Sequence, residues 1–297
     1  MGHNCALRML GPRRQIFFMA PLSGSPRPPR RALPRRILRA GVRRLSGFIA
    51  LDRDPLDTLA RELDRWRAAP ARFWWRDDDA VEETPALDRL LSLRQNLGLP
   101  LALAVIPAQA QPSLARRTEP EDAVRVLVHG WAHRNHAPAG ASASEYPAAR
   151  DAAEVRAELA AAAARLGQLF GRRALHVLVP PFNTLAPALA PAVAAAGFAY
   201  VSIDRDFVAF PVPSHNIHVD LIDWDRRTSV PPAAAVRPLL AALRLRRYGL
   251  VPRGEPIGVM THHLAHDEAV WSLSFRLLDL LARHPGAAFP AVEAIFP

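Results

Sequence analysis

The sequence lacks lysine altogether and has a single cysteine, Cys5, among its 297 residues. One cysteine excludes a disulfide framework and any metal site built on a Cys-x-x-Cys pair. No run of about 18 apolar residues is present, which argues against a membrane-spanning helix. Half of the residues are nevertheless apolar, so the chain has a globular composition and is long enough to bury a full core.

Acidic residues are absent from the first 51 positions, where 11 of the 38 arginines stand. The other 246 residues hold 27 arginines against 28 acids, so the net charge of +10 belongs to the N-terminal segment. A nearly neutral body argues against a nucleic-acid groove, which needs clustered positive charge. We therefore expect an Arg/Pro-rich, disordered tail over 1–50 and one folded domain over 51–297.

Three interpretations of this tail stay open. In the first, the start site is placed too early and Met19 is the alternative start. In the second, the tail is a targeting or lipid-surface segment, and in the third it is an arm that binds nucleic acid. The apolar run from Ile16 to Leu22 is too short for a secretory signal and is interrupted by Pro21. We expect a cytoplasmic protein without a transmembrane segment.

Short apolar stretches alternate with longer amphipathic ones along the body. Strands are predicted at 71–75, 101–106, 124–128, 175–179, 198–203, 217–221 and 257–261, and helices at 56–69, 84–97, 149–170, 185–196, 236–245 and 268–282. This alternation is typical of a parallel sheet covered by helices. About seven strand–helix units in about 250 residues favour an α/β barrel. A doubly wound sheet is the alternative, although the glycine-rich turn of a dinucleotide site is missing.

Acids and histidines gather where the predicted strands end, at the face that carries chemistry in a barrel. They are Asp77, Asp78 and Asp79 after the first strand, His129 and His133 after the third, Asp220 and Asp223 at the sixth, and His262 and His263 after the seventh. His129 and His133 are four positions apart, so a helical segment would place both imidazoles on one face. Two imidazoles and one carboxylate leave a divalent metal with open positions. Solvated acidic turns and loop histidines are the purely structural interpretation.

Taken together, these motifs resemble the polysaccharide deacetylases of the NodB-homology type, a carbohydrate esterase family. The resemblance covers roughly 70–285. Five segments carry it in order: Asp78-Asp79-Ala80, His129-Gly-Trp-Ala-His133, Pro180-Pro181-Phe182, Asp220-Leu-Ile-Asp223-Trp224 and Val259-Met-Thr-His262. It implies a distorted (β/α)7 barrel that holds one divalent metal, usually zinc.

The resemblance also implies a role for each matched residue. Asp79, His129 and His133 would bind the metal, Asp78 would be the general base on water, and His262 the general acid. The backbone N–H of Phe182 would hold the developing oxyanion. Trp224 would form an apolar wall of the site, and Asp220 or Asp223 would orient His262.

The sequence departs from the family pattern in ways that leave alternatives open. Ala80 replaces a glycine, and Val179 stands where the family has the arginine that holds the base carboxylate. Arg76 could reach that carboxylate from its own strand instead. The extra acid Asp77 allows an Asp77/Asp78 register, and His263 could replace His262 as the acid.

The function expected from the resemblance is metal-dependent removal of an acetyl group from an N-acetylated sugar or a polysaccharide-like substrate. A hydrolase of a non-sugar amide is one alternative. A non-catalytic barrel that binds metal or carbohydrate is another, motivated by Val179. A nucleic-acid or membrane-surface protein that acts through its arginine-rich tail is a third.

Overall fold

The computed structural model describes residues 50–204 and 212–297. The predicted tail, except for its last residue, therefore lies outside the described residues, as do Cys5 and Met19. Within the described part, no helix is both long enough and apolar enough to cross a membrane.

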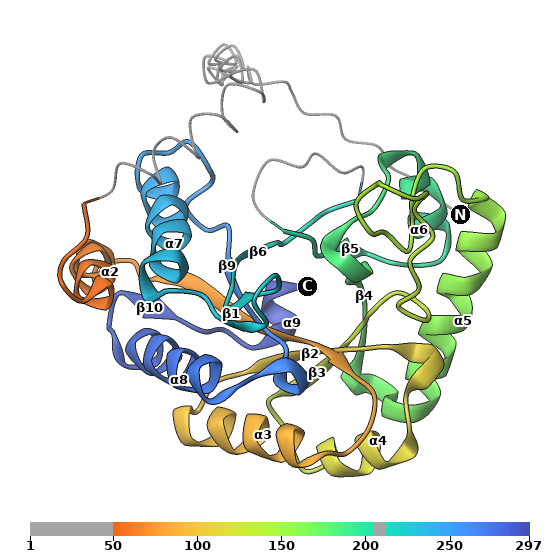
Figure 1. The fold of residues 1–297 in the computed structure, drawn as a ribbon, viewed down its shortest axis with the longest axis horizontal. Helices are drawn as coiled ribbons and strands as arrows, with labels where there is room; N and C mark the ends of the chain where they lie inside the picture. Colours follow the sequence, from red (N-terminus) through yellow and green to blue (C-terminus); the bar gives the residue numbers. More distant parts are fainter. Residues whose placement is uncertain (1–49, 205–211) are drawn as a thin grey trace, which may run out of the picture. The chain divides into compact units, whose positions relative to one another are not determined.

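Seven parallel strands form the centre of the fold, in the order β5-β4-β3-β2-β1-β9-β6 (Figure 1). They are β1 (Ala71–Ala80), β2 (Leu101–Val105), β3 (Val124–Val128), β4 (Ala174–Leu178), β5 (Tyr200–Val201), β6 (Ile217–Asp220) and β9 (Ile257–Thr261). Two further parallel bridges, Val201–Ser214 and Asp204–Ile217, join the end of β5 and the residues after it to β6 and the residues before it. The curled sheet is thus a distorted (β/α)7 barrel, as the sequence predicts.

Helices pack on the outside of these strands (Figure 1). They are α2 (Pro55–Leu63), α3 (Pro85–Leu97), α4 (Pro112–Thr118), α5 (Ala152–Phe170), α6 (Ala190–Ala195), α7 (Pro232–Arg247) and α8 (Glu268–Arg283). Their ends follow local rules, as α3 shows: the Thr84 side chain accepts the Leu87 N–H, Pro85 opens the helix, and Gly98 closes it at a φ of 65°.

The sequence does not predict α4, nor several short strands that complete the fold. The pair β7 (Ile222–Asp223) and β8 (Thr228–Ser229) is antiparallel, and β10 (Ala287–Ala288) adds to the start of β1.

The helix predicted over 185–196 is a 3-10 turn followed by the short α6. A last helix, α9 (Val292–Ile295), packs against the interior of the barrel.

Side chains of β1 alternate between the interior and exterior of the barrel, and this alternation positions the site. Trp74 belongs to the interior cluster, where its ring meets Phe296 at 5.1 Å, while Phe73 and Trp75 pack in the outer core. Continuing the period of two places Arg76 and Asp78 inward and Asp77 outward. The polar residues thus begin directly above an apolar floor made by Trp74 and α9.

Candidate metal centre and surrounding cavity

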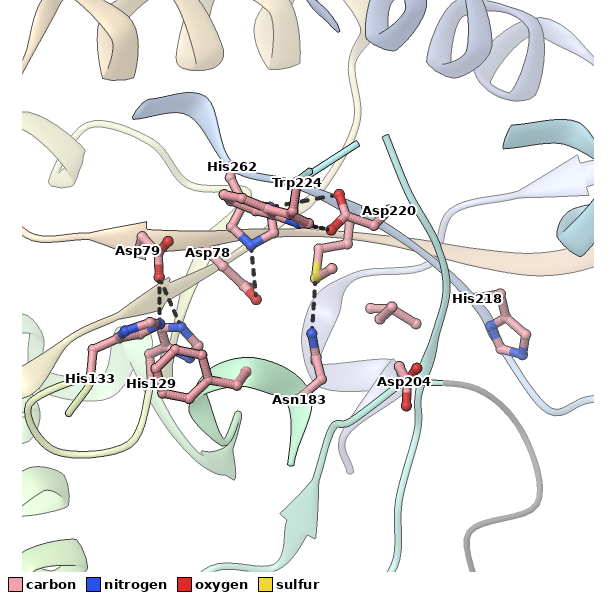
Figure 2. Close-up of a pocket in the computed structure, with 13 residues that line it drawn as sticks. Asp78, Asp79, His129, His133, Asn183, Asp204, His218, Asp220, Trp224 and His262 are labelled. Carbon is pink, nitrogen blue, oxygen red and sulfur yellow. Dashed lines mark hydrogen bonds and ion pairs between the residues drawn. The ribbon is translucent and has the colours of Figure 1, made fainter. Parts of the chain in front are cut away.

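A cavity of about 460 Å³ opens at the carboxyl ends of the strands (Figure 2). Its lining combines titratable groups with two aromatic rings and comprises Asp78, Asp79, His129, His133, Phe182, Asn183, Asp204, Ile217, His218, Asp220, Trp224, Met260 and His262. This is the end of a barrel at which enzymes of this architecture place their chemistry. Among the described residues, the same cavity contains a three-residue cluster able to hold a metal ion.

The cluster consists of Asp79, His129 and His133, whose ligand atoms all lie within 4.8 Å of one another. Asp79 Oδ1 is 3.0 Å from His129 Nε2 and 3.3 Å from His133 Nε2. Asp79 adopts a φ of 70°, which interrupts the strand alternation at the end of β1. One carboxylate and two imidazoles form a donor set that suits zinc and other first-row divalent metals.

Hydrogen bonding around His129 fixes which ring nitrogen faces the cluster. Its Nδ1 lies 2.9 Å from the carbonyl oxygen of Val179, which can only accept a hydrogen bond, so Nδ1 carries the proton. In the neutral ring, Nε2 then presents a lone pair to Asp79 Oδ1. Two lone pairs at this distance require a proton or a cation between them, so the donor set fits a bound metal ion.

The charges of the cluster agree with a cation site. Burial opposes ionisation of Asp79, but the hydrogen bond from His129 and the nearby imidazoles outweigh it and hold the pKa of Asp79 well below its usual range. Burial, reinforced by His129, lowers the pKa of His133. Burial lowers the pKa of His129, but the hydrogen bond with Asp79 and the charges of Asp78 and Asp79 outweigh it and raise that pKa, so metal binding would displace a proton from His129 Nε2. Asp79 as a carboxylate and His133 as a neutral imidazole are already in the forms that bind metals.

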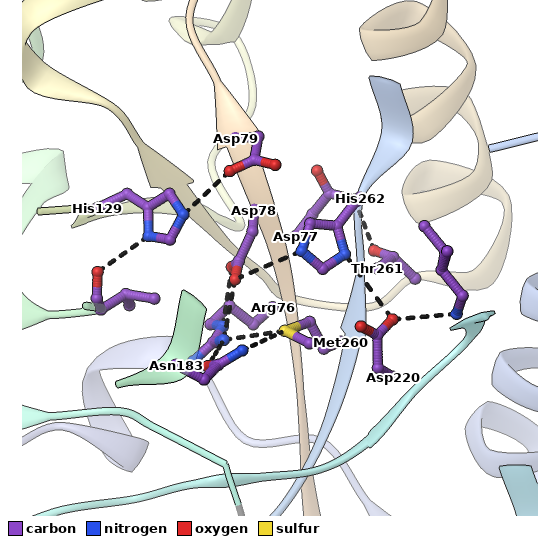
Figure 3. Close-up of polar contacts among 12 residues, drawn as sticks. Arg76, Asp77, Asp78, Asp79, His129, Asn183, Asp220, Met260, Thr261 and His262 are labelled. Carbon is purple, nitrogen blue, oxygen red and sulfur yellow. Dashed lines mark hydrogen bonds and ion pairs between the residues drawn. The ribbon is translucent and has the colours of Figure 1, made fainter. Parts of the chain in front are cut away.

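Arg76 and Asp78 form a buried ion pair beside this cluster (Figure 3). Arg76 Nε lies 2.8 Å from Asp78 Oδ1, and Nη2 donates to Oδ2 at 2.9 Å. The guanidinium is fully buried and also donates to Ser202 Oγ at 2.8 Å and to Asn183 Oδ1 at 2.7 Å. The contact proposed from the sequence is therefore present, and Val179 stays an apolar residue of the interior.

Removing Arg76 is expected to destabilise the fold strongly. Arg76→Met leaves the carboxylate of Asp78 buried without its partner, which costs about 3–5 kcal/mol in free energy of unfolding. Urea denaturation of the metal-free protein measures this loss. Arg72→Met is the matched control on the same strand, because Arg72 donates only to exposed backbone carbonyls. Equal losses of unfolding free energy in the two variants would show that the buried ion pair stabilises the fold no more than the exposed contacts of Arg72 do.

His262 faces Asp78 from β9 across the cavity. Its Nε2 is 3.9 Å from Asp78 Oδ2 and its Nδ1 is 3.8 Å from Asp220 Oδ1, so neither contact is a direct hydrogen bond. The Trp224 ring lies edge-on to the imidazole at 4.7 Å, and its Nε1 donates to Asp220 at 2.7 Å. Burial raises the pKa of Asp220, although His262 and Trp224 oppose this.

The structure separates the two registers that the acidic run allows. Asp77 and His263 do not line the cavity; they are buried against each other, with Oδ1 and Nδ1 2.5 Å apart. Asp77 also accepts hydrogen bonds from the hydroxyl of Thr261 and the backbone of His263. The inward position belongs to Asp78, as the strand alternation requires, while Asp79 reaches the cavity because its φ of 70° interrupts that alternation.

Asp223 and the segment from His129 to His133 differ from what the sequence predicts. Asp223 does not line the cavity and pairs with Arg226 at 2.8 Å, which lowers the pKa of Asp223, so Asp220 is the acid beside His262. The segment from His129 to His133 is not helical: Gly130 and His133 have φ values of 60° and 56°. The imidazoles meet through an irregular loop, with ring centroids 5.1 Å apart.

Phe182 occupies a turn at a φ of 60°, and its ring packs on His133 at 4.6 Å. Together with Trp224, which is 46% exposed, it gives the cavity an apolar surface on two sides.

The sequence does not predict Asp204 or His218 as site residues, and it gives Met260 only as part of the fifth motif, without a role. Asp204 and His218 line the cavity beyond Asn183, and Met260 accepts a hydrogen bond from Arg76 through its sulfur. No motif spacing marks Asp204 or His218. Their places at or near the ends of β5 and β6 are the only signal that the sequence offers.

Comparisons with models of known protein families and with curated proteins find no match to this chain. Solved structures do match. A candidate polysaccharide deacetylase from Mycobacterium smegmatis superposes with a TM-score of 0.52 at 16% identity, covering 71% of this chain and 75% of that one. The peptidoglycan deacetylase PdaC from Bacillus subtilis gives 0.49 at 13% identity, covering 77% and 91%. The first of these superpositions shows that the chain has the polysaccharide deacetylase fold, which confirms the expected architecture.

Proposed function

We propose that this protein is a metal-dependent hydrolase that removes an acetyl group from an N-acetylated sugar or a similar amide. The observation that carries the proposal is the cluster of Asp79, His129 and His133 beside a second, buried carboxylate, Asp78, in one cavity. The fold shared with polysaccharide deacetylases supports the class of substrate. Zinc is the proposed ion, because one carboxylate and two imidazoles form a typical open zinc site.

Asp79, His129 and His133 would hold the ion, while the Val179 carbonyl fixes the His129 tautomer. A divalent cation bound there lowers the pKa of water and polarises the carbonyl of the substrate. Asp78, held in place by Arg76, accepts a proton from the attacking water. The backbone N–H of Phe182 donates to the oxygen that becomes negatively charged.

His262 then donates a proton to the departing amine nitrogen as the carbon–nitrogen bond breaks. Its position supports this role, since it lies across the cavity from Asp78 and Asp220 flanks its second nitrogen. Trp224 and Phe182 give the acetyl group or the sugar face an apolar surface. The products are acetate and a free amine.

Acetate release from N-acetylglucosamine oligomers tests the proposal. We expect release by the wild-type protein, its loss after treatment with a chelator, and its return when Zn²⁺ or Co²⁺ is added. Release from N-acetylated amines alone would assign the hydrolase to non-sugar amides. Tight metal binding without release from either class would contradict catalysis and favour a binding barrel.

A further inference from the structure

Glu145 is a buried carboxylate outside the cavity that no part of the proposed reaction uses. Its side chain is 1% exposed and accepts three hydrogen bonds, all from backbone N–H groups. Oε2 accepts from Trp131 at 3.1 Å, and Oε1 accepts from Ala132 at 2.8 Å and from Arg134 at 3.2 Å. All three donors belong to the loop that joins and flanks His129 and His133.

This loop has no regular structure that could set its own shape. Between the two histidines the backbone takes a left-handed conformation at Gly130 and again at His133, so helical or strand hydrogen bonds do not hold it. A Cβ at position 130 would overlap Glu145 Oε2 and the ring of Pro181, so the loop and the carboxylate pack directly against each other. The Glu145 carboxylate therefore accepts the backbone hydrogen bonds that a helix or a sheet would otherwise accept.

Glu145 is itself anchored to a second segment of the site. Tyr146 forms a parallel bridge with Leu185, and its carbonyl accepts the N–H of Ala186 at 3.0 Å. The hydroxyl of Thr184 donates to the carbonyl of Ala143 at 3.0 Å. The chain just after Phe182 therefore fixes the segment that carries Glu145.

We propose that Glu145 is a positioning residue for the metal centre: it holds the 130–134 loop in the shape that brings His133 to Asp79 and His129. The inference rests on the metal site of the proposed function. It assigns Glu145 no contact with the ion, because its oxygens are already used by the three N–H donors. The cost of losing such an outer partner is typically a 10- to 100-fold loss of metal affinity.

Competition between the protein and a coloured chelator for Zn²⁺ tests the proposal in the full-length chain. We expect Glu145→Ala to bind Zn²⁺ about 10- to 100-fold more weakly than wild type. Glu145→Gln should lose less, because its amide oxygen can still accept the bonds from Ala132 and Arg134. Glu121→Gln is the matched control: Glu121 is equally buried and bonded by Arg94 and Gln95, but it lies before the start of β3.

Hydrogen exchange in the metal-free protein gives a second readout. The amides of Trp131, Ala132 and Arg134 should all exchange faster in Glu145→Ala, whereas in Glu145→Gln mainly that of Trp131 should do so. All three should exchange at the wild-type rate in Glu121→Gln. Wild-type Zn²⁺ affinity in folded Glu145→Ala would overturn the positioning role, whatever its thermal stability. If that variant does not fold, unchanged Zn²⁺ affinity together with unchanged exchange of the Trp131 amide in Glu145→Gln would overturn it. Absence of Zn²⁺ binding by the wild type would instead refute the metal centre itself, and the role of Glu145 with it.

Discussion

Replacing Asp78 with asparagine is expected to slow amide hydrolysis by about 10²- to 10⁴-fold, the usual contribution of a general base. The amide keeps the shape of the carboxylate but cannot accept the proton of the attacking water. Asp78 is not one of the three clustered ligands, so the variant should retain its metal. Acetate release and metal content, measured on the same preparation, separate the two effects.

Asp77→Asn is the control for this substitution, because it makes the same change one residue earlier on the opposite face of β1. Asp77 is bonded to His263 and Thr261 outside the cavity, so its loss should lower stability and leave the turnover of the folded protein intact. Wild-type turnover by Asp78→Asn, or abolished turnover in a stable Asp77→Asn, would place the base elsewhere.

Asp79→Ala and His129→Ala should each abolish metal retention and with it all acetate release. The loss of metal affinity should exceed the 10- to 100-fold that is typical when a residue hydrogen-bonded to a ligand is removed, since each change removes one of the three ligands themselves. Metal content of the purified variants, by elemental analysis, provides the measurement.

His136→Ala is the matched histidine control, because His136 lies in the same loop and is not part of the cluster. It should keep wild-type metal content. Full occupancy in Asp79→Ala or His129→Ala would refute the ligand assignment.

The sequence predicts the barrel well because its strands are short, apolar and separated by helices of ordinary length. The bounds of the strands over 124–128 and 257–261 are exact. The acidic run is different, since β1 continues through it to Ala80 instead of ending at 75. Charged residues lower the propensity for a strand, and here pairing with Arg76 and His263 compensates.

The resemblance predicts the three residues that cluster in the cavity, whereas the local geometry that brings them together could not be predicted. Strand alternation distinguishes Asp78 from Asp77 once Trp74 is known to face inward, but no local pattern shows which face is the interior. The pairing of His129 with His133 depends on left-handed residues that a helical interpretation of the spacing misses. Glu145 supports this loop from a segment whose sequence carries no recognisable signal.

A titration of the chelator-treated wild-type chain with Co²⁺, followed by its visible absorption, tests the central claim most directly. We expect the absorption to saturate at one Co²⁺ per chain, with the spectrum of an ion in low-symmetry coordination. Added Zn²⁺ should displace the Co²⁺ and remove this spectrum, and Asp79→Ala should not develop it. No saturable binding, or the same spectrum in Asp79→Ala, would contradict the claim.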